Sequence, residues 1–143
     1  MTRFFDLDEA NAAIPEVRTI LESLRDQRAE LIRLRDEVLA TGGEEEARGG
    51  SGSDAPTEAK IDADVRVLRL RMQGVIDRMQ AGVVRIDELG VTLREIETGL
   101  IDFPALASGR QIWLCWRLGE GDIEWWHELT EGFGGRQALA DLT

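Results

Sequence analysis

Two long segments of the chain repeat apolar residues at alternating steps of three and four, and this spacing limits the fold more than any other feature. The first repeat runs from Ile14 to Val38, and the second runs from Ile61 to Leu89. Such steps place side chains along one face of an α-helix. Two long helices joined by one connection are expected to fold back as an antiparallel hairpin over residues 7–89.

The start of the first helix carries its own signal. Asp6 is followed three residues later by Glu9, which is the spacing of a capping box, and this predicts a helix that begins near Leu7. Pro15 suits the first turn of a helix, where its missing N–H leaves no hydrogen bond unmade.

Between the two repeats, residues 41–59 are rich in Gly, Ser, Glu and Pro and contain almost no apolar residue. This composition predicts a flexible loop at the tip of the hairpin. A tolerated insertion is the simpler interpretation, and a functional lid is the alternative.

After Gly90 the apolar period changes from helical to two. Residues 91–128 therefore read as the β-rich part of the chain, with turns at Glu97–Gly99 and at 108–110. Residues 129–143 form a Gly-rich tail that is expected to be loop-like. The predicted fold class is α+β: a long antiparallel two-helix hairpin followed by a small C-terminal antiparallel β-meander of three or four strands.

Composition excludes several classes of protein. A chain of 143 residues fits a single domain, 1–143, and its net charge of -11 argues against binding to nucleic acid or to an anionic membrane. The start of the chain does not resemble a signal peptide, and no run approaches the roughly 20 apolar residues of a membrane span. One cysteine permits no disulfide within the chain, so a cytoplasmic protein is expected.

The two helices carry more apolar residues than a single apolar face on one partner helix can cover. Leu34, Leu39, Leu70 and Ile76 are additional to the two repeats. A four-helix assembly from two chains would cover this excess, which predicts a homodimer formed through the helices.

The stretch 114–127, LCWRLGEGDIEWWH, holds the only cysteine, the only histidine and three of the four tryptophans. A turn through Gly119–Asp122 would place Leu118 opposite Ile123 and match apolar with apolar residues. We prefer this register over one with a three-residue loop, which would change every pairing.

This choice of register separates Cys115 from His127, because the two side chains then point to opposite faces of the sheet. It also places Arg117 opposite Glu124 as a cross-strand ion pair. Cys115 is then most simply a small buried residue. With a loop one residue shorter, Cys115 and His127 would share a face, as a nucleophilic Cys–His dyad requires.

Three interpretations of His127 remain open: a core or interface histidine, a ligand-binding or catalytic group, and a metal ligand. No metal and no cofactor are expected, because HExxH, GxSxG, CxxC and phosphate-loop motifs are all missing from the sequence. The alternative to this expectation is a metal site that combines His127 with Glu120 and Glu128, or with Asp102.

Asp102 lies in an apolar predicted strand, where a carboxylate needs a partner such as Arg117 or Arg136. Together with the aromatic stretch, it suggests a polar-aromatic patch for a protein partner or a small ligand. The candidate residues of this patch are Asp102, Trp113, Cys115, Arg117, Glu120, Trp126, His127, Glu128 and Arg136.

The favoured function is a dimeric binding or assembly module that presents this patch on its C-terminal sheet. The alternative is a metal-dependent or His-based enzyme with its site around His127. Whether the protein is an enzyme stays open at this point, and so does the identity of any substrate.

The motifs GLIDFPAL, LCWRLGE, WWHEL and GFGGRQ follow a helical hairpin that opens with FFDLDEANAAIP. In this order they resemble the bacterial domain-of-unknown-function family 2203, which implies no known activity. Relatives often have Asp where this chain has Glu128. The positions that match the family's motifs are Asp102, Phe103, Pro104, Cys115, Trp116, Arg117, Gly119, Glu120, Trp126, His127, Gly132 and Arg136.

Overall fold

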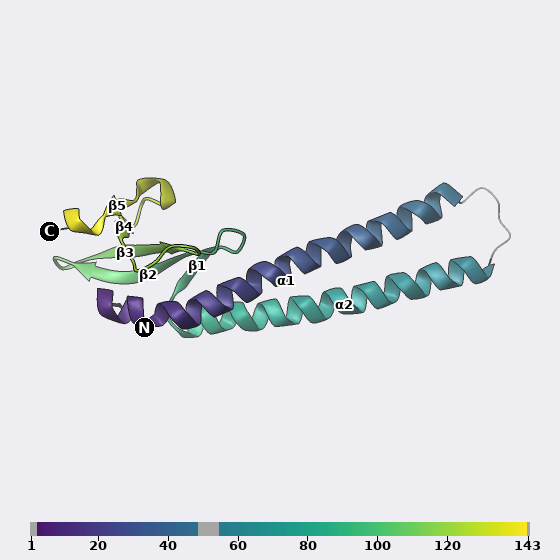
Figure 1. The fold of residues 1–143 in the computed structure, drawn as a ribbon, viewed down its shortest axis with the longest axis horizontal. Coiled ribbons are helices and arrows are strands. Elements are labelled where there is room, and N and C mark those ends of the chain that lie inside the picture. The colour runs from purple at the N-terminus through teal and green to yellow at the C-terminus, as the bar shows by residue number, and fades with distance from the viewer. Residues whose placement is uncertain (1–2, 49–54, 143) are drawn as a thin grey trace. The chain divides into compact units, whose positions relative to one another are not determined.

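The computed structural model describes residues 3–48 and 55–142. Two long helices, α1 (Leu7–Arg48) and α2 (Ala55–Glu88), precede a five-stranded antiparallel sheet in the order β1-β2-β3-β4-β5 (Figure 1). The predicted α+β fold, a helical hairpin followed by a β-meander, is confirmed. Among the described residues, no helix combines the length and the apolar character that crossing a bilayer requires.

The predicted capping box is present at the start of α1. The Glu9 main-chain N–H donates to Oδ1 of Asp6 at 2.7 Å, and the Asp6 N–H donates to Oε1 of Glu9 at 3.3 Å. Pro15, however, lies inside the continuous helix α1 rather than in its first turn. Ile14 and Val17 are both buried, and we attribute the continuity of the helix to this packing, which offsets the hydrogen bond that proline cannot make.

Both helices extend into the segment that the composition assigns to a loop. Helix α1 continues to Arg48 and α2 begins at Ala55, so the prediction of a loop is wrong for residues 41–48 and 55–59. Glutamate and alanine favour helix and outweigh the neighbouring glycines in this segment. The rest of the predicted loop, residues 49–54, lies outside the described residues.

Contacts divide the chain into two compact units. The first unit comprises residues up to Arg25 and from Ala81 onward, and the second comprises Asp26–Gln80. In the first unit, Arg85 of α2 bonds Glu16 of α1 at 2.6 Å, and in the second unit Arg78 lies 3.8 Å from Glu30. Within each unit, therefore, the two helices lie side by side.

The sheet belongs to the first unit. Its strands are β1 (Thr92–Glu95), β2 (Leu100–Ala107), β3 (Arg110–Arg117), β4 (Trp125–His127) and β5 (Gln137–Ala138). The meander has five strands instead of the expected three or four, because the Gly-rich tail adds β5. The same tail forms two short 3-10 helices, at Phe133–Gly135 and Leu139–Asp141.

One face of the sheet packs on the first turns of α1. Phe5 contacts Phe103 of β2 edge to face, with ring centroids 5.1 Å apart, and the Phe5 N–H donates to the Pro104 carbonyl. Arg18 of α1 lies over the Trp116 ring of β3. Because side chains alternate along a strand, Asp102, the residue before Phe103 in β2, points to the opposite face.

The predicted register between β3 and β4 is wrong by one residue. In the structure Trp113 pairs with His127, Leu114 with Trp126 and Cys115 with Trp125. This is the pairing expected for a shorter turn, although the connection is longer: residues 118–124 join the strands as a loop that begins with a β-turn, in which the Glu120 N–H donates to the Arg117 carbonyl.

Hydrogen bonds to the sheet and to α1 help to hold this loop. Trp116 Nε1 donates to the carbonyl of Gly121, and the Ile123 N–H donates to Oδ1 of Asn11 in α1. The second bond ties the loop to a helix more than a hundred residues away in the sequence. The register therefore depends on tertiary contacts as well as on the pattern of the hairpin itself.

A buried carboxylate–imidazole–thiol cluster

Three chemically different side chains meet on the sheet face that points away from α1. Asp102 comes from β2, Cys115 from β3 and His127 from β4, and each is at most 2 % exposed. One oxygen, sulfur or nitrogen atom from each side chain lies within 4.8 Å of the corresponding atoms of the other two. The one-residue change in register brings them together, so the expectation that Cys115 and His127 point to opposite faces is wrong.

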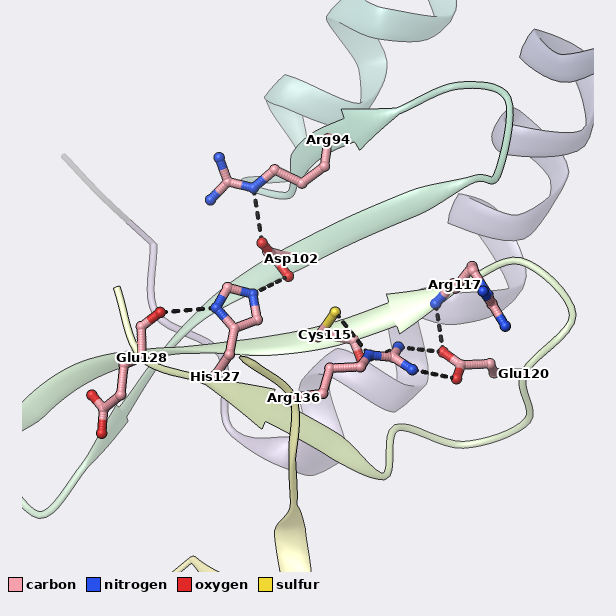
Figure 2. Close-up of polar contacts among 8 residues, drawn as sticks. All are labelled: Arg94, Asp102, Cys115, Arg117, Glu120, His127, Glu128 and Arg136. Atoms are coloured by element: carbon pink, nitrogen blue, oxygen red, sulfur yellow. Dashed lines mark hydrogen bonds and ion pairs between the residues drawn. The ribbon is translucent and has the colours of Figure 1, made fainter. Parts of the chain in front are cut away.

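The imidazole of His127 is held at both nitrogens. Nδ1 lies 2.9 Å from the main-chain oxygen of Glu128, and Nε2 lies 3.0 Å from Oδ1 of Asp102 (Figure 2). A carbonyl oxygen only accepts, so Nδ1 carries the proton in its contact. The contact between Nε2 and the carboxylate oxygen is then completed either by a second ring proton, which makes His127 a cation, or by a metal ion that binds both atoms.

Asp102 is also held from its other side. Arg94 of β1 donates from Nε to Oδ2 of Asp102 at 2.8 Å, while its terminal nitrogens point away from the cluster in Figure 2. The guanidinium of Arg94 lies over the ring of Trp113 at 4.8 Å from the centroid. The partner of Asp102 is thus neither Arg117 nor Arg136, as the sequence suggested, but Arg94 together with His127.

Cys115 is contacted by the tail of the chain. Arg136 donates from Nε to Sγ of Cys115 at 3.3 Å, and its two terminal nitrogens bond both oxygens of Glu120 at 2.7 and 2.6 Å. Glu120 also accepts from the main-chain N–H of Arg117 at 2.7 Å. Arg136 of the tail and Glu120 of the β3–β4 loop are therefore joined beside the Cys115 thiol.

The pKa of Cys115 is raised from its usual 9.0 to about 11. Burial is the largest cause, and Asp102 adds to it, whereas the hydrogen bond from Arg136 acts in the opposite direction. For Glu120, burial raises the pKa, but the hydrogen bonds from Arg136 and Arg117 outweigh it and the net pKa is lowered. Without a further cation the thiol therefore remains protonated at neutral pH.

These contacts disfavour a nucleophilic Cys–His dyad even though both residues share a face. The nucleophile needs an imidazole nitrogen free to take its proton. Both nitrogens of His127 face other groups, Glu128 and Asp102, and the thiol is almost inaccessible. The arrangement suits metal ligation better, because carboxylate, imidazole and thiol are the ligands that zinc takes in proteins.

The remaining candidate residues lie apart from the cluster. The side chain of Glu128 reaches Arg110 at 2.8 Å, and Arg117 lies over the ring of Phe133 rather than opposite Glu124. Trp126 is buried on the helix-facing side of the sheet, whereas Trp113 is half-buried beside the cluster. The candidate patch therefore divides into a buried polar part and a smaller accessible part.

Sequence reasoning missed Arg94, although the sequence contains a signal for it. With the predicted turn at Glu97–Gly99, residue 94 lies directly opposite Asp102 on the neighbouring strand. The structure instead pairs Thr92 with Asp102 and has an irregularity between Leu93 and Glu95, and the long arginine side chain still reaches the carboxylate.

The fold and the site together define an α+β protein with a helical hairpin and a small sheet that holds a closed Asp–His–Cys cluster. The chain belongs to the DUF2203 family: the family model, described as "Uncharacterized conserved protein (DUF2203)", matches residues 3–139. Comparison with the curated proteins and with the solved structures finds no match to the chain.

Proposed function

We propose that this protein binds one divalent transition-metal ion, zinc in the first instance, through Asp102, Cys115 and His127. The observation that carries the proposal is the contact of His127 Nε2 with Asp102 Oδ1, two atoms 3.0 Å apart with the Cys115 sulfur close by. A metal ion would bind both atoms in place of a proton on Nε2, and the buried thiol supplies a soft third ligand.

The groups behind the three ligands support this proposal. Ligating histidines usually donate their other N–H to a carbonyl or carboxylate, and His127 Nδ1 faces the Glu128 carbonyl. The carboxylate of Asp102 accepts from Arg94, and the sulfur of Cys115 accepts from Arg136. Each ligand is thus oriented by a partner outside the cluster.

Charge and size are also compatible with a divalent ion. Asp102 and an ionised Cys115 together neutralise two positive charges, and metal binding deprotonates a coordinating thiol. Ligand atoms around a tetrahedral zinc stand on the order of 3.3–3.6 Å apart. The widest separation in the cluster, within 4.8 Å, would therefore contract by about 1 Å on binding.

Three protein ligands leave one position of a tetrahedral zinc ion for a water molecule, and the burial of all three restricts access to it. The meeting of a carboxylate, an imidazole and a thiol favours the metal-dependent interpretation of the site over a nucleophilic or purely structural histidine. The residues that share the site with His127 are then Asp102 and Cys115, because Glu120 and Glu128 bond Arg136 and Arg110 instead.

The test is the zinc content of protein purified after growth with added zinc and dialysed against metal-free buffer. We expect equimolar zinc in the natural protein and a loss of zinc in Cys115→Ser and in His127→Ala. Glu128→Gln is the matched control and should keep its zinc, since its side chain lies on Arg110. Zinc-free natural protein, or equal zinc in all variants, contradicts the proposal.

We also propose that two chains associate through their helices. The support is a set of apolar side chains in the second unit that remain in contact with water: Leu39 is 65 % exposed, Leu70 68 % and Val67 48 %. Large apolar side chains that recur together on exposed helix surface favour burial against a partner.

A further inference from the structure

A second feature of the first unit lies beside the Asp102–Cys115–His127 cluster but does not include it. A cleft of about 480 Å³ opens where the end of α2 meets the sheet. Its size is within the range of pockets that hold small molecules. Its lining includes the charged residues Arg3, Asp87 and Glu88 and, from the sheet, Thr92, Pro104 and Trp113.

Pro104 and Trp113 form the apolar wall of the cleft. Pro104 and Trp113 pair across β2 and β3, and both alternate onto the same sheet face as Asp102 and Cys115. The guanidinium of Arg94 already lies over the ring of Trp113. Arg94 thus already occupies one face of the ring, and Trp113 offers apolar ring surface to a ligand in the cleft.

The cleft also has an acidic side. Asp87 and Glu88 are the last two residues of α2, so the negative end of the helix dipole adds to their charges. Glu88 lies 3.6 Å from Arg85, so Asp87 and the helix end are the stronger attraction for a small ligand's ammonium group.

The cleft also has a basic side. Arg3 lines the cleft, and its side chain is 51 % exposed. Its polar contacts are long, with Nη1 3.4 Å from the carbonyl of Leu89 and Nη2 3.7 Å from Glu9, and its guanidinium lies over the Phe5 ring at 4.2 Å from the centroid. The guanidinium thus retains donors for a carboxylate in the cleft.

From this arrangement we infer that the cleft binds a small organic zwitterion, a molecule that carries one ammonium and one carboxylate on a short apolar body. The ammonium lies toward Asp87 and Glu88, the carboxylate toward Arg3, and the apolar body against Trp113. Free amino acids have this chemistry. The inference does not depend on the metal, because no cleft residue is one of the three proposed ligands.

The experiment uses three probes with the same carbon branch: leucine, 3-methylbutylamine and 4-methylpentanoate. The first is the zwitterion, the second lacks the carboxylate and the third lacks the ammonium. Binding is followed by the indole N–H signal of Trp113 in ¹H–¹⁵N NMR spectra, identified with Trp113→Phe. We expect leucine to shift this signal and to bind at least about tenfold more tightly than either single-charge probe.

Charge removal on each side of the cleft gives a second measurement. Asp87→Asn and Arg3→Gln should each weaken leucine binding about tenfold, while Glu22→Gln, an exposed substitution outside the cleft, should not change it. His127→Ala should bind leucine as the natural protein does, which separates this site from the metal site. Equal binding of leucine and the amine, or no shift at millimolar concentrations, overturns the inference.

Discussion

His127 of β4 and Asp102 of β2 meet across the strand that separates them. Strand β3 lies between the two, and the Nε2–Oδ1 distance of 3.0 Å spans it next to Cys115. Each ring nitrogen of His127 therefore faces an oxygen acceptor, with Glu128 on the other side. This contact in a buried site is the physical basis of the proposed metal centre.

Two substitutions of Asp102 should have different effects on the metal-free protein. In Asp102→Asn the amide donates to Nε2 of His127 and its oxygen accepts from Arg94, so we expect a loss of no more than about 1 kcal/mol in the free energy of unfolding. In Asp102→Ala both partners lose their contact, and we expect a loss of about 3 kcal/mol. Urea denaturation in the presence of chelator measures both values.

The control for this pair is Asp122→Asn, which changes an exposed carboxylate in the β3–β4 loop and should stay within about 0.5 kcal/mol of the natural protein. An Asp102→Asn protein as unstable as Asp102→Ala would show that Asp102 and His127 form a charged pair without need of a further cation.

Cys115 should react slowly with thiol reagents in the folded, metal-free protein. Its pKa of about 11, against a usual 9.0, lowers the fraction of reactive thiolate about 100-fold at mildly alkaline pH. We therefore expect Ellman's reagent to modify the folded protein at least about 100-fold more slowly than the urea-unfolded protein. Similar rates in the two states would contradict both the burial and the raised pKa.

The Glu120–Arg136 pair should make stability depend on pH in the acid range. The pKa of Glu120 is lowered from its usual 4.5, so its carboxylate stabilises the fold above that pH, and the contribution is lost as pH falls through the lowered pKa. We expect Glu120→Gln to be less stable than the natural protein at neutral pH, with the difference shrinking at about pH 3. Urea denaturation at both pH values tests this, and a difference that does not change with pH would refute it.

The proposed dimer predicts a mass of twice 16.0 kDa by light scattering at micromolar concentrations. Replacing Leu39 and Leu70 together by Gln should shift the protein toward the monomer, because both side chains are largely exposed in the single chain. Leu106→Gln, which changes a side chain 58 % exposed on β2, is the control and should leave the mass unchanged. A natural protein that scatters only as a monomer would refute the dimer.

The helices and the strand order could be predicted from the sequence because each depends on a local pattern. The steps of three and four indicated both helices, the Asp6–Glu9 pair located the start of α1, and the period of two after Gly90 indicated the sheet. The C-terminal end of α1 and the N-terminal end of α2 were misplaced, because glycine and glutamate tracts do not by themselves end a helix.

The candidate site was predicted in its residues but not in its geometry. Asp102, Cys115, His127 and Arg136 were all candidates, yet the preferred turn placed the thiol and the imidazole on opposite faces. The actual register depends on the Ile123–Asn11 hydrogen bond between the β3–β4 loop and α1. A contact between residues so far apart in the sequence is not readable from the hairpin pattern, and a slip of one residue reverses every face.

The most direct test of the metal centre is the visible and near-ultraviolet spectrum of the protein titrated with Co²⁺ in place of zinc. We expect saturation at one equivalent, with intense tetrahedral d–d bands and a sulfur-to-cobalt charge-transfer band, both of which Cys115→Ser removes. A spectrum identical to that of free cobalt, or a charge-transfer band that survives the loss of Cys115, would contradict the proposed Asp102–Cys115–His127 site.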